Sequence, residues 1–383
     1  MSEPAIGPAM ELVTARPGEM RPGPSRGSLI RSGSRVGGDA ILAGLCAGSG
    51  LLVILMLAAL VAVMFHASLP TIKEFGWKFL ITSEWRPNTL EVPRTDAQGN
   101  VQIVDGETVM EKIPPSFGAL PVIFGTTVSS LVALVFAVPL SFGAALFLIR
   151  IAPKMFAGPV SFLIEFLAAI PSIAYGMWGL FVLAPFLQSH VESWFDSVYH
   201  WLGSPGWLHW MFQDTTALPG GEVLVRDIAL TGRDMFCGGL VLAIMIVPIV
   251  TAISRDVLKS VPRAQIEGTV ALGATWWQSS KEMLRYSRAG LFGAVMLGLA
   301  RAAGETMAVT MVIGNNNQIR ASLFAPAQTM SSLLANEFAE ASTELHKSAL
   351  SEVALILLVM SLGFNVVARY LVVGKGSRSA AAH

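Results

Sequence analysis

The chain carries little charge for its length. Of its 383 residues only 14% are Asp, Glu, Lys or Arg, whereas about a quarter of an average soluble domain is charged. The 26 basic and 26 acidic residues cancel, and a net charge of zero gives no electrostatic attraction toward nucleic acid. Hydrophobic residues make up 53% of the chain and the mean hydropathy is +0.60. This composition excludes an ordinary soluble domain and indicates a membrane protein.

Cysteine and closely spaced histidine are also scarce. Cys46 and Cys237 both lie inside apolar runs, which predicts neither a disulfide framework nor a metal site. The histidines of one long loop, His190, His200 and His209, are ten and nine residues apart, unlike the short ligand spacing of a zinc motif. We therefore expect no metal and no cofactor.

Sequence motifs of catalysis are missing as well. The chain has no Gly-x4-Gly-Lys-Ser/Thr phosphate loop, the motif that cradles the phosphates of ATP in many ATPases. Its apolar stretches contain no grouping of a nucleophile, a base and metal ligands. We therefore expect that the chain is not an enzyme, and that any ATP hydrolysis it uses takes place on a separate protein.

What the sequence does contain is six apolar stretches long enough to cross a membrane, which takes about 20 helical residues. Their approximate limits are 40–66, 118–149, 161–187, 235–254, 289–313 and 349–373. These stretches predict an all-α polytopic membrane protein with six transmembrane helices. The expected division is a disordered tail over 1–39, a first helix and outer loop over 40–117, a core over 118–373 and a C-terminal tail over 374–383.

Basic residues are concentrated in four segments of the chain. Together with Arg369 near the end of the last apolar stretch, the two tails and the loops after the second and fourth stretches hold 16 of the 26 Lys and Arg residues. Nine more are spread over the three remaining loops, and Arg301 lies inside the fifth apolar stretch. Because cytoplasmic loops carry an excess of Lys and Arg, both termini and the 255–288 loop are predicted to be cytoplasmic.

The two long outer loops, 67–117 and 188–234, differ in character. The second holds four tryptophans, Trp194, Trp201, Trp207 and Trp210. Tryptophan prefers the boundary between lipid and water. We expect part of this loop to form a helix that lies on the outer surface of the membrane.

The cytoplasmic loop 255–288 contains the most informative polar segment. Residues 264–272 are predicted to form a short helix, and Gly273 ends it because glycine readily adopts the left-handed conformation of a helix C-terminus. A second helical stretch, 276–284, follows. A short helix, a glycine and a second helix suit insertion into a groove on a partner protein, and an ordinary loop at the membrane surface is the alternative.

An ionisable pair interrupts the fifth apolar stretch. Arg301 and Glu305 are four residues apart, so a continuous helix would place them on one face, within contact distance. Charged groups inside a membrane span are costly and by default indicate a functional site. Arg301 is predicted to lie near mid-membrane, about 18 Å along a helix that starts at Ala289. The alternative is a permanent structural ion pair between helices.

Three segments carry a resemblance to a known family. Residues 267–273 look like the coupling motif of ABC-importer permeases, in which Glu-Ala-Ala is followed by three residues and Gly. Two further segments are similar to phosphate-specific permeases: residues 165–179, which begin with Glu165-Phe-Leu-Ala-Ala-Ile-Pro-Ser172, and Gly304-Glu-Thr-Met-Ala-Val309. The second of these resembles the PstC type more than the PstA type. The resemblance covers about residues 118–373, and the first apolar stretch fits as an extra N-terminal helix.

The sequence departs from the coupling motif at two places. Gly268 and Thr269 occupy the two alanine positions. The Ile-x-Leu-Pro that usually closes the motif reads Met283-Leu-Arg-Tyr286, without a proline. The motif therefore predicts where the coupling helix lies, but it does not predict the direction in which the chain leaves this helix.

The resemblance implies that the chain is a type I ABC importer permease in a bacterial inner membrane. It also implies that the permease works by alternating access. ATP binding would push on a coupling helix near 263–285 and rock the membrane helices. The contact would be made by Glu267, Ala271, Leu272 and Gly273. The implied partners are a second, PstA-like permease, two PstB-like ATPase subunits, a periplasmic PstS-like phosphate-binding protein, inorganic phosphate and membrane lipid, with no nucleic acid.

Five residues are candidates for the substrate pathway. Arg301 is expected to contact phosphate, because its guanidinium fork matches phosphate oxygens, and Glu305 to pair with it when the pathway is empty. Ser172 and Tyr175 would add neutral donors at mid-depth. Glu165 lies near the cytoplasmic end of its helix, where a basic loop residue or the neighbouring subunit would be its partner. Since the three charged candidates sum to −1, an arginine of the second permease is expected to add positive charge.

Two other functions fit part of this pattern. A permease of the same class for another oxyanion, sulfate or molybdate, would share the fold and the coupling element. A secondary transporter or channel driven by an ion gradient would explain the charged pair inside the membrane span. It would not explain the cytoplasmic helix–glycine–helix element.

Overall fold

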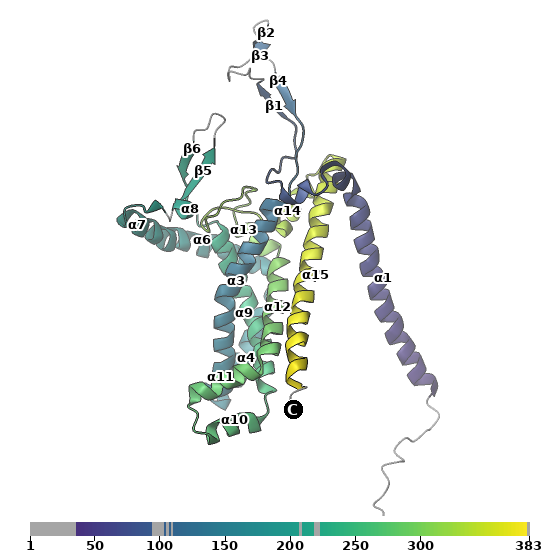
Figure 1. Ribbon diagram of the computed structural model, residues 1–383, viewed down its shortest axis with the longest axis vertical. Helices are drawn as coiled ribbons and strands as arrows, with labels where there is room; N and C mark the ends of the chain where they lie inside the picture. Colours follow the sequence, from purple (N-terminus) through teal and green to yellow (C-terminus); the bar gives the residue numbers. More distant parts are fainter. Residues whose placement is uncertain are drawn as a thin grey trace, which may run out of the picture. The chain divides into compact units, whose positions relative to one another are not determined.

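The computed structural model is mostly helical (Figure 1) and describes residues 36–93, 103–104, 107–108, 110–206, 209–217 and 223–380. The chain divides into two compact units between Ala59 and Leu60, so the first part of helix α1 (Val36–Phe75) is described by itself. Residues 1–35 of the expected disordered tail lie outside the described residues. From Val36 onward the chain is helical, four residues before the predicted start of the first span.

The core is a bundle of helices that pack side by side. Its members are α3 (Leu120–Leu146), α9 (Met235–Lys259), α12 (Arg288–Ala303) and α15 (Glu344–Ala380). In the most apolar part of α9, 61% of the residues are buried, against 33% in that part of the α3 span and 17% in that of α15. Helix α9 is therefore the central helix. Small residues permit this packing, since a Cβ added at Gly239 of α9 would lie 2.5 Å from a Val132 methyl carbon of α3.

Four helices of the described chain are long and apolar enough to cross a membrane. They are α1 over Ala40–Phe75, α3 with its π-helical extension η1 over Leu120–Ile151, α9, and α15 over Glu344–Val367. A bent pair, Met155–Ala168 and Ser172–Trp201, makes a fifth if it counts as one span. The six predicted spans are therefore not all found as single helices, because the stretches 161–187 and 289–313 are each broken into shorter helices.

The third predicted span is the bent pair. Helix α4 (Lys154–Ala168) ends just before Pro171, and the helical path resumes 88° away. Proline cannot donate a backbone hydrogen bond and disfavours a helical residue before it, which accounts for the break. The second arm consists of α5 (Ser172–Trp178), η2 (Gly179–Leu183), α6 (Ala184–Phe186), η3 (Leu187–Glu192) and α7 (Ser193–Trp201).

The fifth predicted span is also two helices. Helix α12 ends at Ala303 and α13 (Met307–Val312) begins after a three-residue break. The Ser331 hydroxyl donates to the Glu305 carbonyl at 2.6 Å, so a group from another helix satisfies a backbone oxygen at the break. Glycine at position 304 weakens the helix at the same place.

One end of the bundle carries short helices and hairpins. The helices are α2 (Lys78–Ile81), α8 (His209–Phe212) and α14 (Met330–Glu337). Among the described residues, three antiparallel pairs are formed by β1 (Leu90–Pro93) with β4 (Met110–Ile113), β2 (Ile103–Val104) with β3 (Glu107–Thr108), and β5 (Gln213–Ala217) with β6 (Val223–Asp227). Leu90 is opposite Ile113 in the first pair. We call this the hairpin end; its strands lie in predicted loops, while the bundle itself is all-α.

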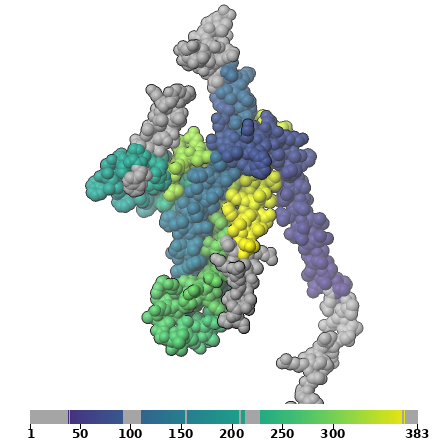
Figure 2. All heavy atoms as spheres, in the orientation of Figure 1, coloured from purple at the N-terminus to yellow at the C-terminus, as the bar shows by residue number. Residues whose placement is uncertain are grey.

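The opposite end carries α10 (Arg263–Ala271) and α11 (Trp276–Tyr286). These two helices protrude from the bundle (Figure 1), and in Figure 2 they form a green knob. Helix α15 continues to Ala380, so most of the predicted C-terminal tail is helical.

Polar side chains attach the end of α1 to the bundle. The Thr71 hydroxyl is 2.7 Å from that of Ser348 on α15. Glu337 of α14 accepts a hydrogen bond from the Trp85 indole at 2.8 Å and lies 3.0 Å from the His346 ring nitrogen. The Phe117 ring stacks on His346. The last part of α1, from Leu60 onward, is therefore fastened to the core at the hairpin end.

Candidate functional site

The two broken spans meet inside the bundle. Helix α5, which follows the first break, packs against α13, which follows the second. Gly176 makes this close approach possible, because a Cβ there would lie 2.9 Å from both the Ala308 Cα and the Met311 sulfur. Interrupted helices inside a membrane protein are tolerated where their free backbone groups are satisfied by protein or line a cavity. The two breaks therefore lie beside each other, at the crossing of α5 and α13.

The break in the fifth predicted span separates the charged pair. Arg301 lies in the last turn of α12 with an exposed side chain, whereas Glu305 lies in the break. The Glu305 carboxylate accepts a hydrogen bond from the Ala308 backbone at 3.4 Å, and no ion pair joins Arg301 to Glu305 in the described part of the chain. The expectation that both residues share one continuous helix face is thus wrong, because the helix stops at Ala303.

Arg301 and Tyr175, predicted separately, come close together. The Arg301 charge lies within electrostatic reach of the Tyr175 hydroxyl. That hydroxyl donates to the Leu167 carbonyl at 2.8 Å, so Tyr175 bridges the bend between α4 and α5 and satisfies a carbonyl left free at a helix end. Ser172 opens α5 and lies three residues before Tyr175, on the same face of the helix. Three of the five candidates therefore belong to one neighbourhood.

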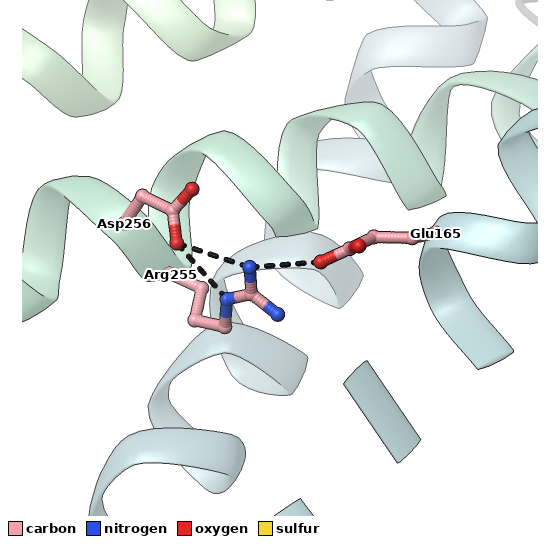
Figure 3. A network of polar contacts seen from close by, with 3 residues as sticks. All are labelled: Glu165, Arg255 and Asp256. Atoms are coloured by element: carbon pink, nitrogen blue, oxygen red, sulfur yellow. Dashed lines mark hydrogen bonds and ion pairs between the residues drawn. The ribbon is translucent and has the colours of Figure 1, made fainter. Parts of the chain in front are cut away.

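Glu165 belongs to a different contact, shown in Figure 3. Its carboxylate lies 2.9 Å from the Arg255 guanidinium, which also contacts the Asp256 carboxylate at 3.0 Å. The Arg255 side chain is 12% exposed and that of Glu165 is 53% exposed. The expected basic partner of Glu165 is thus Arg255, which lies on α9. This ion pair links α4 to the central helix, and a role of Glu165 in the pathway stays a prediction.

The α10–α11 hairpin has the form expected from the sequence. Helix α10 ends at Ala271, and Gly273 adopts φ = +82°, the left-handed region that favours glycine. Thr275 and Gln278 form a reciprocal capping box that starts α11. The predicted boundaries, 264–272 and 276–284, are confirmed to within two residues.

The tip of this hairpin is solvent-exposed although it is partly apolar. Leu272 is 90% exposed, and Glu267, Ala271 and Gly273 are exposed as well. Trp277 adds an exposed aromatic ring. A projecting helix with an uncovered apolar tip is suited to contact with another protein.

A buried acidic pair at the hairpin end escaped the sequence reasoning. Glu192 and Asp234 are both fully buried, and Asp234 caps α9 by accepting a hydrogen bond from the Cys237 backbone at 2.7 Å. Burial raises the pKa of Asp234 to about 8, and the nearby Glu192 carboxyl also raises this pKa. An acid before an apolar run predicts a helix cap, but a partner 42 residues away leaves no local signal.

Comparison with known proteins gives a consistent result. Residues 137–374 match the family described as "Binding-protein-dependent transport system inner membrane component". The phosphate transport system permease protein PstC of Mesorhizobium japonicum is 38% identical, over 90% of this chain and 92% of that protein. The PstC protein of Haemophilus influenzae is also 38% identical, over 84% of this chain and 89% of its own length.

A more distant relative and a solved structure were also found. PstC 1 of Mycobacterium tuberculosis is 35% identical over 78% of this chain and 82% of that protein. A chain of the inward-facing MetNI methionine ABC transporter has a TM-score of 0.45 at 15% identity, and the match covers 67% of this chain and 94% of that chain.

Proposed function

Because this chain belongs to the binding-protein-dependent transport inner membrane components, and among them to the PstC phosphate permeases, we propose that it is a membrane subunit of an ATP-driven importer of inorganic phosphate. The observation that carries the proposal is the match to phosphate permeases along 90% of the chain. The protruding α10–α11 hairpin supports it independently, because a passive permease needs a surface on which its motor can act.

In this proposal the ATPase attaches to the α10–α11 hairpin. The chain has no phosphate loop, so ATP is hydrolysed on a separate chain. Closure of two ATPase subunits on ATP displaces α10 through contacts with Glu267, Ala271, Leu272 and Gly273. The uncovered Leu272 side chain supplies apolar area for that contact, and its burial stabilises the assembly.

The substrate pathway of this proposal runs along the α5–α13 crossing. Arg301 supplies a fork of N–H donors for a phosphate ion, and Tyr175 and Ser172 supply neutral hydroxyls nearby. Glu305 is held by the Ala308 backbone, so it approaches phosphate only if that hydrogen bond opens. A second, PstA-like permease subunit completes the pathway and adds positive charge.

The proposed orientation places the α10 end in the cytoplasm, with both termini. Helix α10 lies in the Lys- and Arg-rich segment that the distribution of basic residues assigns to the cytoplasmic side. The hairpin end then faces the periplasm, where strands β1, β4, β5 and β6 offer projecting backbone to a phosphate-binding protein.

The proposal is tested by purifying the chain with its neighbours and measuring transport. Tagged protein from native membranes should retain a second permease and an ATPase, and vesicles with the binding protein should accumulate radioactive phosphate when ATP is supplied. Excess sulfate or molybdate should not compete. Uptake of sulfate or molybdate in place of phosphate would contradict the substrate assignment, and failure to retain any ATPase would contradict the importer.

A further inference from the structure

Thr269 on α10 occupies a position where the coupling motif of ABC-importer permeases has alanine. Its hydroxyl oxygen lies 2.7 Å from the Ile266 carbonyl oxygen and 3.3 Å from the Ser279 hydroxyl oxygen. Ser279 belongs to α11 and is 1% exposed. The threonine therefore adds a polar link between the two helices of the hairpin, which alanine cannot form.

The same serine continues the link into the membrane bundle. The Arg150 guanidinium donates to the Ser279 hydroxyl at 3.2 Å. Arg150 lies in η1 (Phe147–Ile151), the direct extension of α3. Three side chains from α10, α11 and η1 thus form one continuous chain of hydrogen bonds, although Arg150 and Ser279 are 129 residues apart in sequence.

Apolar packing surrounds this chain but has a different mechanical character. Leu146, Leu258, Met283 and Leu291 form a buried cluster at the α10 end, against which Ile266 packs. Hydrophobic contact is non-directional, so packed helices can slide against each other. Hydrogen bonds weaken steeply with changes in distance and angle, and they therefore hold the hairpin and η1 in one relative position.

We propose that Thr269, Ser279 and Arg150 form a strut that transmits displacement of the coupling helix to α3. The inference rests on the proposed attachment of an ATPase to α10. Helix α3 packs along the central helix α9, so movement of α3 reaches the substrate pathway. Thr269 is a positioning residue in this role, because it acts on the pathway through Ser279 and Arg150.

The test compares Thr269→Val with Thr269→Ser in the complete transporter, reconstituted in vesicles with inorganic phosphate as the substrate. Valine keeps the branched shape and removes the hydroxyl, whereas serine keeps the hydroxyl. In the valine variant the ATPase subunits should still co-purify and hydrolyse ATP, because Glu267 and Leu272 are unchanged. Phosphate transported per ATP should fall by about fivefold, the ratio that corresponds to the loss of one hydrogen bond. Serine should restore the wild-type ratio.

A second variant tests whether the residues act as one unit. Ser279→Ala should lower the same ratio, and the Thr269→Val/Ser279→Ala double variant should be no worse than either single variant, because all three break one link. An unchanged ratio in Thr269→Val would overturn the inference. So would loss of the ATPase from that variant alone, which would mean that Thr269 only maintains the shape of the hairpin. A wild-type complex without ATP-driven uptake would instead overturn the proposed function.

Discussion

Gly273→Ala should loosen the attachment of the ATPase without unfolding the bundle. A Cβ at this position meets nothing within 4 Å, so the cost is conformational and arises from φ = +82°. An L-residue in the left-handed region costs about 1–2 kcal/mol, which corresponds to about a 5- to 30-fold change in an equilibrium constant. The substituted protein should retain less ATPase, because the α10–α11 hairpin spends less time in the conformation that requires a positive φ at residue 273.

Gly268→Ala is a matched control in the same hairpin. Gly268 lies inside α10 and a Cβ there also meets nothing within 4 Å. Alanine stabilises a helix interior relative to glycine by about 0.5–1 kcal/mol. The assay is the ratio of ATPase to permease after purification in detergent, with ATP hydrolysis measured on the same sample.

The two alanine substitutions should therefore have different effects on retention of the ATPase. Gly273→Ala should lower the ratio of ATPase to permease, Gly268→Ala should not, and Gly273→Asn should fall between them, because asparagine tolerates the left-handed region. Equal retention of the ATPase by Gly273→Ala and Gly268→Ala would refute the assignment of the hairpin as the attachment point.

Three further predictions concern the rest of the molecule. Arg301→Ala should abolish uptake of radioactive phosphate while the partner subunits still co-purify, because the anion loses its guanidinium donors. The raised pKa of Asp234, about 8 against an ordinary 3.8, means that this carboxyl contributes most to stability below about pH 4 and that its contribution is lost as the pH rises to about 8. Asp234→Asn should therefore reduce the fall of the melting temperature over this pH range. A spin label at Trp201, which is 83% exposed, should be accessible to oxygen dissolved in lipid, because tryptophan favours the membrane interface.

Each of these predictions has a result that contradicts it. Normal phosphate uptake by Arg301→Ala would remove that residue from the pathway. A melting temperature that rises between pH 5 and 8 would show that the Asp234 carboxyl is not protonated in the folded protein. A label at position 201 with the same accessibility to water-soluble nickel complexes as one at exposed Gln278 would place α7 in water.

Local signals in the sequence were sufficient to predict the α10–α11 hairpin. A glycine that ends one helix and a threonine that caps the next act within a few residues of each other, and both ends of each helix were predicted to within two residues. The bundle helices α3, α9 and α15 were likewise recognisable from long apolar runs, whose burial in lipid or protein does not depend on details of their contacts.

Contacts between distant residues could not be predicted in the same way. The break after Ala303 involves Ser331, which holds the Glu305 carbonyl from another helix. Hydropathy alone therefore favoured one straight span and one shared helix face. The partner of Glu165 is Arg255, 90 residues further along the chain. Periodicity within a single helix carries no information about either contact.

The most direct test of the central claim is the dependence of phosphate uptake on the ATPase subunits. Vesicles that contain this chain, its permease partner and the binding protein should accumulate phosphate only when the ATPase and ATP are both present. They should lose that uptake when the ATPase is replaced by a form that binds ATP but cannot hydrolyse it. Uptake that persists without the ATPase and follows an ion gradient would contradict the account.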